Sequence, residues 1–145
     1  MEETTTDWVD CSLFLMIASA EATDHYLDEQ EIAVIIEKAE MLVSTFARKK
    51  TRYTSQEIER KFKKTFDRYI DIGDAAPQGQ MDQMIMDEYE RCATFLKDQK
   101  WFNPTFAQSL IVDLVAIAEA DGEVIKNEEN SINKIAQLWG IKAPY

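Results

Sequence analysis

Four acidic side chains have a spacing that would suit a metal-binding site. They form two pairs whose members are seven residues apart, Asp24 with Glu31 and Asp121 with Glu128. Calcium and magnesium prefer oxygen ligands, so each pair could hold one such cation if a short turn brought its two carboxylates together. Asp28 and Glu123 lie beside these pairs and are candidate further ligands. The pattern therefore predicts acidic turns that bind a divalent cation.

The same acidic residues also have an explanation that needs no metal. Asp28 and Asn127 are ordinary N-cap residues, and acidic side chains in the first turn of a helix are stabilised by exposed N–H groups and the helix dipole. An EF-hand is excluded, because Ile125 and Ile132 stand at the fifth and twelfth positions counted from Asp121, where that loop needs oxygen ligands. The spacing alone leaves both functions open, metal ligand and helix cap.

The elements that would position these carboxylates occur twice in the sequence. Residues 18–22 match residues 116–120 in four of five positions. After Thr23 the offset between the two stretches changes by one residue, and with that shift Ile35 in the first copy aligns with Ile132 in the second. Each copy reads as an apolar helix, an acidic turn and a second, amphipathic helix. We expect the two apolar helices to pack against each other in the core and thereby bring the two turns close together.

The second copy resembles the signature of the tellurite-resistance TerB-like family, which carries such a turn twice. Its residues 118–124 read Ala-Glu-Ala-Asp-Gly-Glu-Val and are followed by the helix-starting Glu128. The first copy departs from that pattern by the insertion of Thr23 and by His25 at the position of the glycine. The resemblance implies an all-helical fold, acidic turns that are candidate sites for a divalent cation, and a link to resistance against chemical stress. It does not imply an enzyme.

Apolar residues recur every three or four positions through most of the chain, and no segment alternates with a period of two. This pattern predicts an all-α fold, with residues 1–145 forming one domain. A capping box at residues 54–57 and Pro104 directly after Asn103 mark two helix starts. We predict six helices, at about residues 7–22, 28–47, 55–72, 80–98, 104–121 and 127–139. The first helix should be central, because residues 13–18 are apolar on all sides.

The composition and net charge limit the kinds of partner that the protein can bind. The net charge of −11 would repel phosphate backbones and acidic lipids, so we expect no nucleic-acid binding. The longest apolar run is too short to cross a bilayer and the first residues lack the basic start of a signal peptide, so we expect a cytoplasmic protein with no membrane insertion. Cys11 and Cys92 both fall on apolar helical faces and are predicted to be buried, reduced thiols.

Residues 48–68 differ from the rest of this acidic chain. They hold nine basic and three acidic side chains, a local charge of +6 that leaves −17 elsewhere. Lys61 and Lys64 are therefore candidate contacts for an acidic partner protein, although a solvated face over an apolar one is the commoner role of such a helix. Methionines cluster in residues 81–86 and could form an adaptable contact surface or fill the core.

Catalytic patterns are missing from the sequence. It has no glycine-rich phosphate loop, no cysteine–histidine pair with a plausible base, and no Glu-x-x-His pair of the kind used by di-iron bundles. We therefore predict a non-enzymatic, stress-associated module. Its acidic turns would bind calcium or magnesium, or else it would be a metal-free adaptor that uses the basic helix and the methionine surface. The oligomeric state is left open.

Overall fold

The computed structural model describes residues 7–20, 29–46, 54–76, 79, 81–119 and 126–145. Within these ranges the chain forms helices and no strand, so the predicted all-α class is confirmed. The helices are α1 (Trp8–Ser19), α2 (Glu29–Phe46), α3 (Ser55–Ala75), α4 (Met81–Lys97), α5 (Pro104–Ala118) and α6 (Lys126–Leu138).

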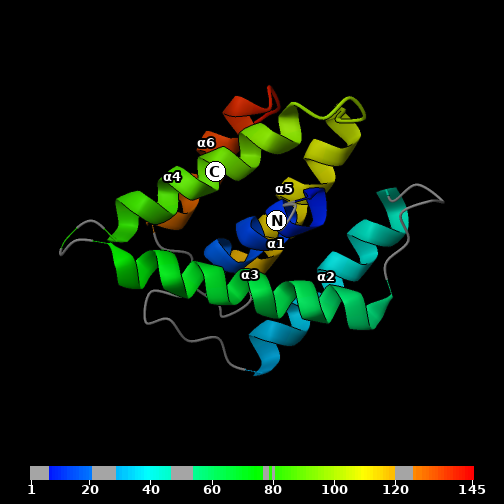
Figure 1. The fold of residues 1–145 in the computed structure, drawn as a ribbon. Helices are drawn as coiled ribbons and strands as arrows, with labels where there is room; N and C mark the ends of the chain where they lie inside the picture. Colours follow the sequence, from blue (N-terminus) through cyan, green and yellow to red (C-terminus); the bar gives the residue numbers. More distant parts are fainter. Residues whose placement is uncertain (1–6, 21–28, 47–53, 77–78, 80, 120–125) are drawn as a thin grey trace.

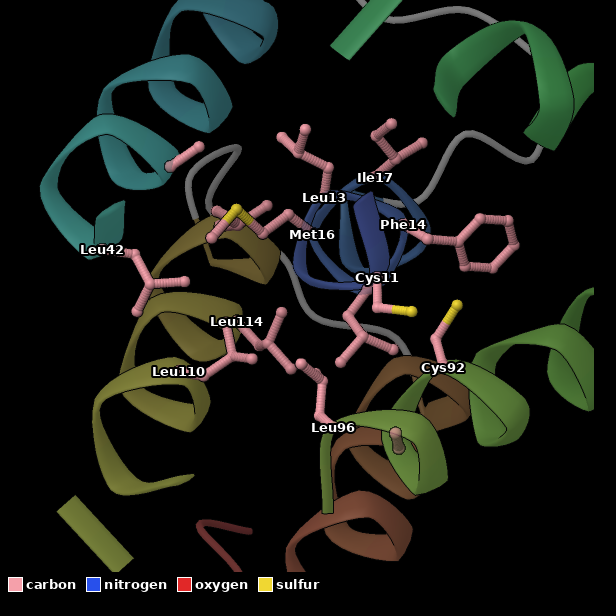
Figure 2. Close-up of a cluster of buried hydrophobic side chains, with 14 of the residues drawn as sticks. Cys11, Leu13, Phe14, Met16, Ile17, Leu42, Cys92, Leu96, Leu110 and Leu114 are labelled. Atoms are coloured by element: carbon pink, nitrogen blue, oxygen red, sulfur yellow. The ribbon is translucent and has the colours of Figure 1, made fainter. Parts of the chain in front are cut away.

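Helix α1 is the centre of the fold. It packs against α2, α3, α4 and α5, and Figure 1 shows it in dark blue, with α3 on one side and α4 on the other. Its side chains from Leu13 to Ile17 are fully buried. Figure 2 shows Leu13, Phe14 and Met16 leaving the helix in different directions. Burial of five such side chains stabilises the fold by roughly 10 kcal/mol before conformational entropy is subtracted. The predicted central helix and its packing against α5 are both confirmed.

The helix starts follow the predicted capping chemistry. Thr54 and Glu57 form the capping box that precedes α3, and the Asn103 side chain accepts a hydrogen bond from the backbone N–H of Phe106 at the start of α5. Asp7 is the N-cap of α1 and forms a second capping box with Asp10. Side-chain acceptors thus satisfy backbone N–H groups that have no partner inside these helices.

The helix ends differ from the prediction by a few residues. Helix α1 ends at Ser19 rather than near residue 22, and α5 ends at Ala118 rather than near residue 121. Helix α3 continues through Gly73 to Ala75, and its C-cap Ala76 then takes an extended backbone with ψ 139°. An extended backbone is what a residue directly before a proline prefers, so Pro77 in the sequence accounts for this end better than the glycine does.

Helix α6 is held to the fold at its C-terminal end. The indole Nε1 of Trp139 donates a 3.0 Å hydrogen bond to the carbonyl oxygen of Ala93 on α4. Gly140 follows with φ +74°, and the N–H groups of Gly140 and Ile141 donate to carbonyl oxygens of the last helical turn. The left-handed φ explains why glycine stands at this C-cap.

An aromatic cluster surrounds Phe106, the third residue of α5. The ring of Phe106 lies 4.9 Å from that of Trp101, 5.1 Å from that of Phe46 and 6.0 Å from that of Trp8, measured between centroids. All three pairs meet edge to face, the arrangement that the ring quadrupoles favour. The cluster therefore joins α1, α2 and α5 with the segment that precedes α5.

Candidate functional site

The predicted metal ligands fall largely outside the described residues. Glu31 lies in the first turn of α2, as expected, and its side chain is half-buried. Four others, Asp24, Asp28, Asp121 and Glu123, lie outside the described residues, as does His25. Glu128 belongs to α6, but its side chain is also outside the description. The convergence of the carboxylates, and with it the duplicated unit, therefore stays a prediction.

The helices that flank the two acidic segments are in place. Helix α1 ends at Ser19 before the first segment and α2 begins at Glu29 after it, while α5 ends at Ala118 and α6 begins at Lys126 around the second. Helix α1 packs on α2 and α5 packs on α6. Among the side chains that the structure does describe, no group of three or more histidine, cysteine, aspartate or glutamate residues is arranged to hold a metal ion.

Lys61 has a role inside the fold that the sequence did not reveal. Its Nζ lies 3.2 Å from Oδ2 of Asp7 and 3.4 Å from Oδ1 of Asp10. Asp10 is buried, and its burial raises the pKa of its carboxyl, an effect that the hydrogen bond from the Asp7 backbone and the charge of Lys61 partly offset. The ammonium group thus compensates two carboxylates at the start of the central helix, and α3 is joined to α1 there.

Lys64, the other candidate contact, lines a hollow of about 510 Å³ that α3 forms with the start of α1. The residues around this hollow are of both charges and are Asp10, Arg60, Lys63, Lys64, Thr65, Asp67, Arg68 and Asp71. Arg60, Lys63 and Lys64 are exposed and cluster in the first half of α3. Neither Lys63 nor Lys64 forms an ion pair with the residues that the structure places. We call Arg60, Lys63 and Lys64 the basic rim of the hollow.

The other end of the hollow is bounded by Arg68, whose charge is already compensated. Its guanidinium pairs with Glu88 on α4, which also accepts hydrogen bonds from Arg91. Burial favours the protonated form of Glu88, but the hydrogen bond from Arg91 and the charges of both arginines outweigh it and hold the pKa of this carboxyl below its usual value. Arg68 also lies 5.2 Å from the centroid of the Phe14 ring and therefore contacts the core.

The methionine segment is less exposed than a contact surface would require. Met84 and Met86 are half-buried, and Met86 packs against the core, while the side chain of Met81 is not among those described. The large hydrophobic side chains that are exposed in the described part are Met41 on α2, Val112 on α5 and Tyr145 in the segment after α6. No helix in the described ranges is long and apolar enough to cross a membrane.

The basic rim is thus the described surface that could bind a ligand by charge. Two carboxylates of a bound segment could approach Lys63 and Lys64 without displacing an ion pair of the fold, whereas an approach to Lys61 would compete with Asp7 and Asp10.

Residues 12–144 match the family model described as TerB, Tellurite resistance protein TerB. No curated protein and no solved structure matches the chain.

Proposed function

The chain belongs to the TerB family of tellurite resistance proteins, and on that premise we propose that it is a binding module rather than an enzyme. Its ligand is an acidic segment of a partner protein, which docks on the basic rim of the α3 hollow. The module thereby acts in a response to tellurite or a related chemical stress by assembling with that partner.

The observation that carries this proposal is the exposed basic rim in an otherwise anionic protein. Arg60, Lys63 and Lys64 stand together at a hollow of about 510 Å³. A positive cluster within a chain of net charge −11 attracts acidic partners to one place and repels them elsewhere. The charge pattern therefore favours one orientation of an acidic segment along α3.

The binding energy would come from several weak contacts. An exposed ion pair contributes about 0.2–1 kcal/mol, so three such pairs on the rim give a low affinity unless apolar contacts add to it. The affinity should fall as ionic strength rises, because these charges are open to solvent and are screened by salt. Such a module would assemble and dissociate readily.

The experiment compares two double variants of equal charge. We would titrate a fluorescein-labelled, glutamate-rich peptide with each protein and follow fluorescence anisotropy at several ionic strengths. Lys63→Glu with Lys64→Glu should abolish binding, whereas Lys97→Glu with Lys100→Glu, which reverses two exposed lysines away from the rim, should retain most of it. Equal losses in both variants would mean that only net charge matters and would remove the rim as a site.

A divalent cation at the acidic turns is the second candidate function. It is supported by the position of Glu31 in the first turn of α2 and by the family match, which spans both acidic segments. Calcium or magnesium would be held by Asp24, Glu31, Asp121 and Glu128, with Asp28 and Glu123 at the edge. A cation there would fix how the helix pairs α1–α2 and α5–α6 are joined, without any catalytic step.

A further inference from the structure

Two cysteines that are far apart in the sequence face each other in the core. Cys11 lies on α1 and Cys92 on α4, both are fully buried, and both are free thiols, as predicted. Figure 2 shows the two sulfur atoms turned toward one another across the interface between these helices. The two thiols are close enough for each to shift the pKa of the other. Packing of α1 on α4 has therefore built a pair of thiols from residues 81 positions apart.

The surroundings of the two sulfurs differ. Sγ of Cys92 lies 3.7 Å from a guanidinium nitrogen of Arg68 and 3.8 Å from a carboxylate oxygen of Glu88, which is itself paired with Arg68 and Arg91. Cys11 is also fully buried and stands on α1 between Asp10 and Ser12, directly before the apolar run of that helix. The charged cluster of Arg68, Glu88 and Arg91 therefore contacts the sulfur of Cys92 directly, whereas no such contact is made by the sulfur of Cys11 among the described residues.

This asymmetry distinguishes the acidities of the two thiols. The neighbouring Cys11 thiol and the positive charges of Arg68 and Arg91 lower the pKa of Cys92, against the opposing effects of burial and of the Glu88 charge. The neighbouring Cys92 thiol and burial raise the pKa of Cys11 far above its ordinary value, and the charges of Arg91 and Arg68 offset this only in part. Since the thiolate is the nucleophile, Cys92 is the thiol suited to attack first. Cys11 is placed to resolve because its sulfur faces that of Cys92.

Cys92 is fully buried, but a single side chain separates its sulfur from the hollow beside α3. The Arg68 side chain lies between its sulfur and the hollow, contacts both, and is about a third exposed. The Nε of Arg68 is buried and has no hydrogen-bond partner among the described residues. Arg68 is thus the side chain that separates Sγ of Cys92 from the hollow.

We propose that Cys11 and Cys92 are a reversible dithiol site that hydrogen peroxide oxidises to an intramolecular disulfide between α1 and α4. The Cys92 thiolate attacks one oxygen of the peroxide, the O–O bond breaks, and Cys92 sulfenic acid forms while the hydroxide released takes up a proton to become water. The Cys11 sulfur then attacks Sγ of Cys92, the S–O bond breaks, and the hydroxyl leaves with the Cys11 proton as a second water. Two thiols thus give two electrons to one peroxide, and a dithiol reductant such as dithiothreitol reverses the change.

The test uses the full chain in its reduced form, exposed to hydrogen peroxide and then alkylated with a maleimide in denaturant. We expect both thiols to become unreactive, the intact mass to fall by two hydrogens, and the protein to keep the size that it has when reduced. Dithiothreitol should restore both thiols. Persistence of two free thiols, or disulfides that link separate chains, would overturn the proposal.

Variants assign the order of attack. In Cys11→Ala, Cys92 should stop at sulfenic acid and give a dimedone adduct, whereas in Cys92→Ala the Cys11 thiol should stay reduced. The reverse assignment would overturn the mechanism. Circular dichroism establishes that each variant is folded. A comparison of wild type with the Arg68→Gln variant, both exposed to hydrogen peroxide, gives a further test that leaves both cysteines in place. Loss of the Arg68 charge should move the pH profile of oxidation upward, and an unchanged profile would contradict the role of Arg68 beside Cys92.

Discussion

Nζ of Lys61 on α3 lies 3.4 Å from Oδ1 of the buried Asp10 on α1, across 51 residues of sequence. The same carboxylate accepts a 3.0 Å hydrogen bond from the backbone N–H of Asp7. One ammonium group therefore supports the capping box that starts the central helix, and the stability of that helix is linked to the protonation of Asp10.

Lys61→Met should destabilise the protein by about 1–3 kcal/mol at neutral pH, because a buried carboxylate would lose its compensating charge. Burial already raises the pKa of Asp10 in the folded state, and loss of Lys61 raises it further. The folded variant then binds the Asp10 proton more tightly than the folded wild type does. Its deficit is therefore full above the raised pKa of the variant and disappears as the pH falls below the pKa of Asp10 in the folded wild type.

Urea unfolding of wild type and variant at neutral and acidic pH would measure this deficit. Asp10→Asn in the Lys61→Met background should recover part of the stability, since the amide oxygen can still accept the hydrogen bond from Asp7. A deficit that is independent of pH would show that Lys61 acts through packing alone.

Phe106→Ala should destabilise the fold by about 3–5 kcal/mol, because it removes a fully buried ring and leaves a cavity. The loss also breaks edge-to-face contacts with Trp101, Phe46 and Trp8. Val112→Ala on the same helix is the control, because Val112 is 56% exposed and its truncation should cost less than about 0.5 kcal/mol. Similar thermal midpoints for the two variants would contradict the central place of Phe106.

Local patterns in the sequence predicted the helices, and they also predicted which helix lies at the centre of the fold. The run at residues 13–18 could only be accommodated by burial on all sides, and the signals at Thr54, Asn103 and Gly140 report local backbone chemistry that does not depend on the rest of the fold. Each of these elements could therefore be derived from neighbouring residues.

The contacts between helices could not be derived in this way. An apolar stripe shows which face of a helix is buried but not which side chains of another helix it meets, so neither the pairing of Lys61 with Asp10 nor the meeting of Cys11 with Cys92 was predicted. The local charge correctly indicated a basic surface on α3, and Lys64 stands on it. Lys61 is turned to the fold instead, because Asp7 and Asp10 lie opposite it.

Oxidation of the Cys11–Cys92 pair should stabilise the protein against urea. A cross-link that closes a loop of this length restricts the unfolded chain and raises the free energy of unfolding by up to about 4 kcal/mol in the chain-entropy model. The slope of unfolding free energy against urea should fall as well, because the cross-linked unfolded chain exposes less surface.

The measurement compares oxidised protein with and without dithiothreitol, and Cys11→Ala treated identically serves as the control. The stabilisation should vanish on reduction and be missing in the variant. A lower urea midpoint for the oxidised protein would mean that the disulfide distorts the interface between α1 and α4. That result would contradict the inference that the two thiols already face each other in a position to be joined.

Calcium or magnesium should raise the melting temperature if the acidic turns form a cation site, because a ligand that binds only the folded state stabilises it by mass action. The expectation rests on the equal spacing of Asp24 to Glu31 and of Asp121 to Glu128. Helix caps alone would respond to these cations only through general screening of charge, so a monovalent salt at equal ionic strength gives the baseline for each thermal scan.

Asp121→Asn separates the two explanations of the acidic turns. It keeps the size of the side chain and an oxygen that can accept a hydrogen bond, so a capping role should tolerate it, whereas loss of the negative charge should weaken a hard-cation site. We expect the variant to melt close to wild type without cation and to lose most of the shift that calcium or magnesium causes. Asp98→Asn, at an exposed carboxylate just after α4, should keep the full shift. Equal shifts in wild type and Asp121→Asn, or none in either, would leave the acidic turns as helix caps and the basic rim as the binding site of the module.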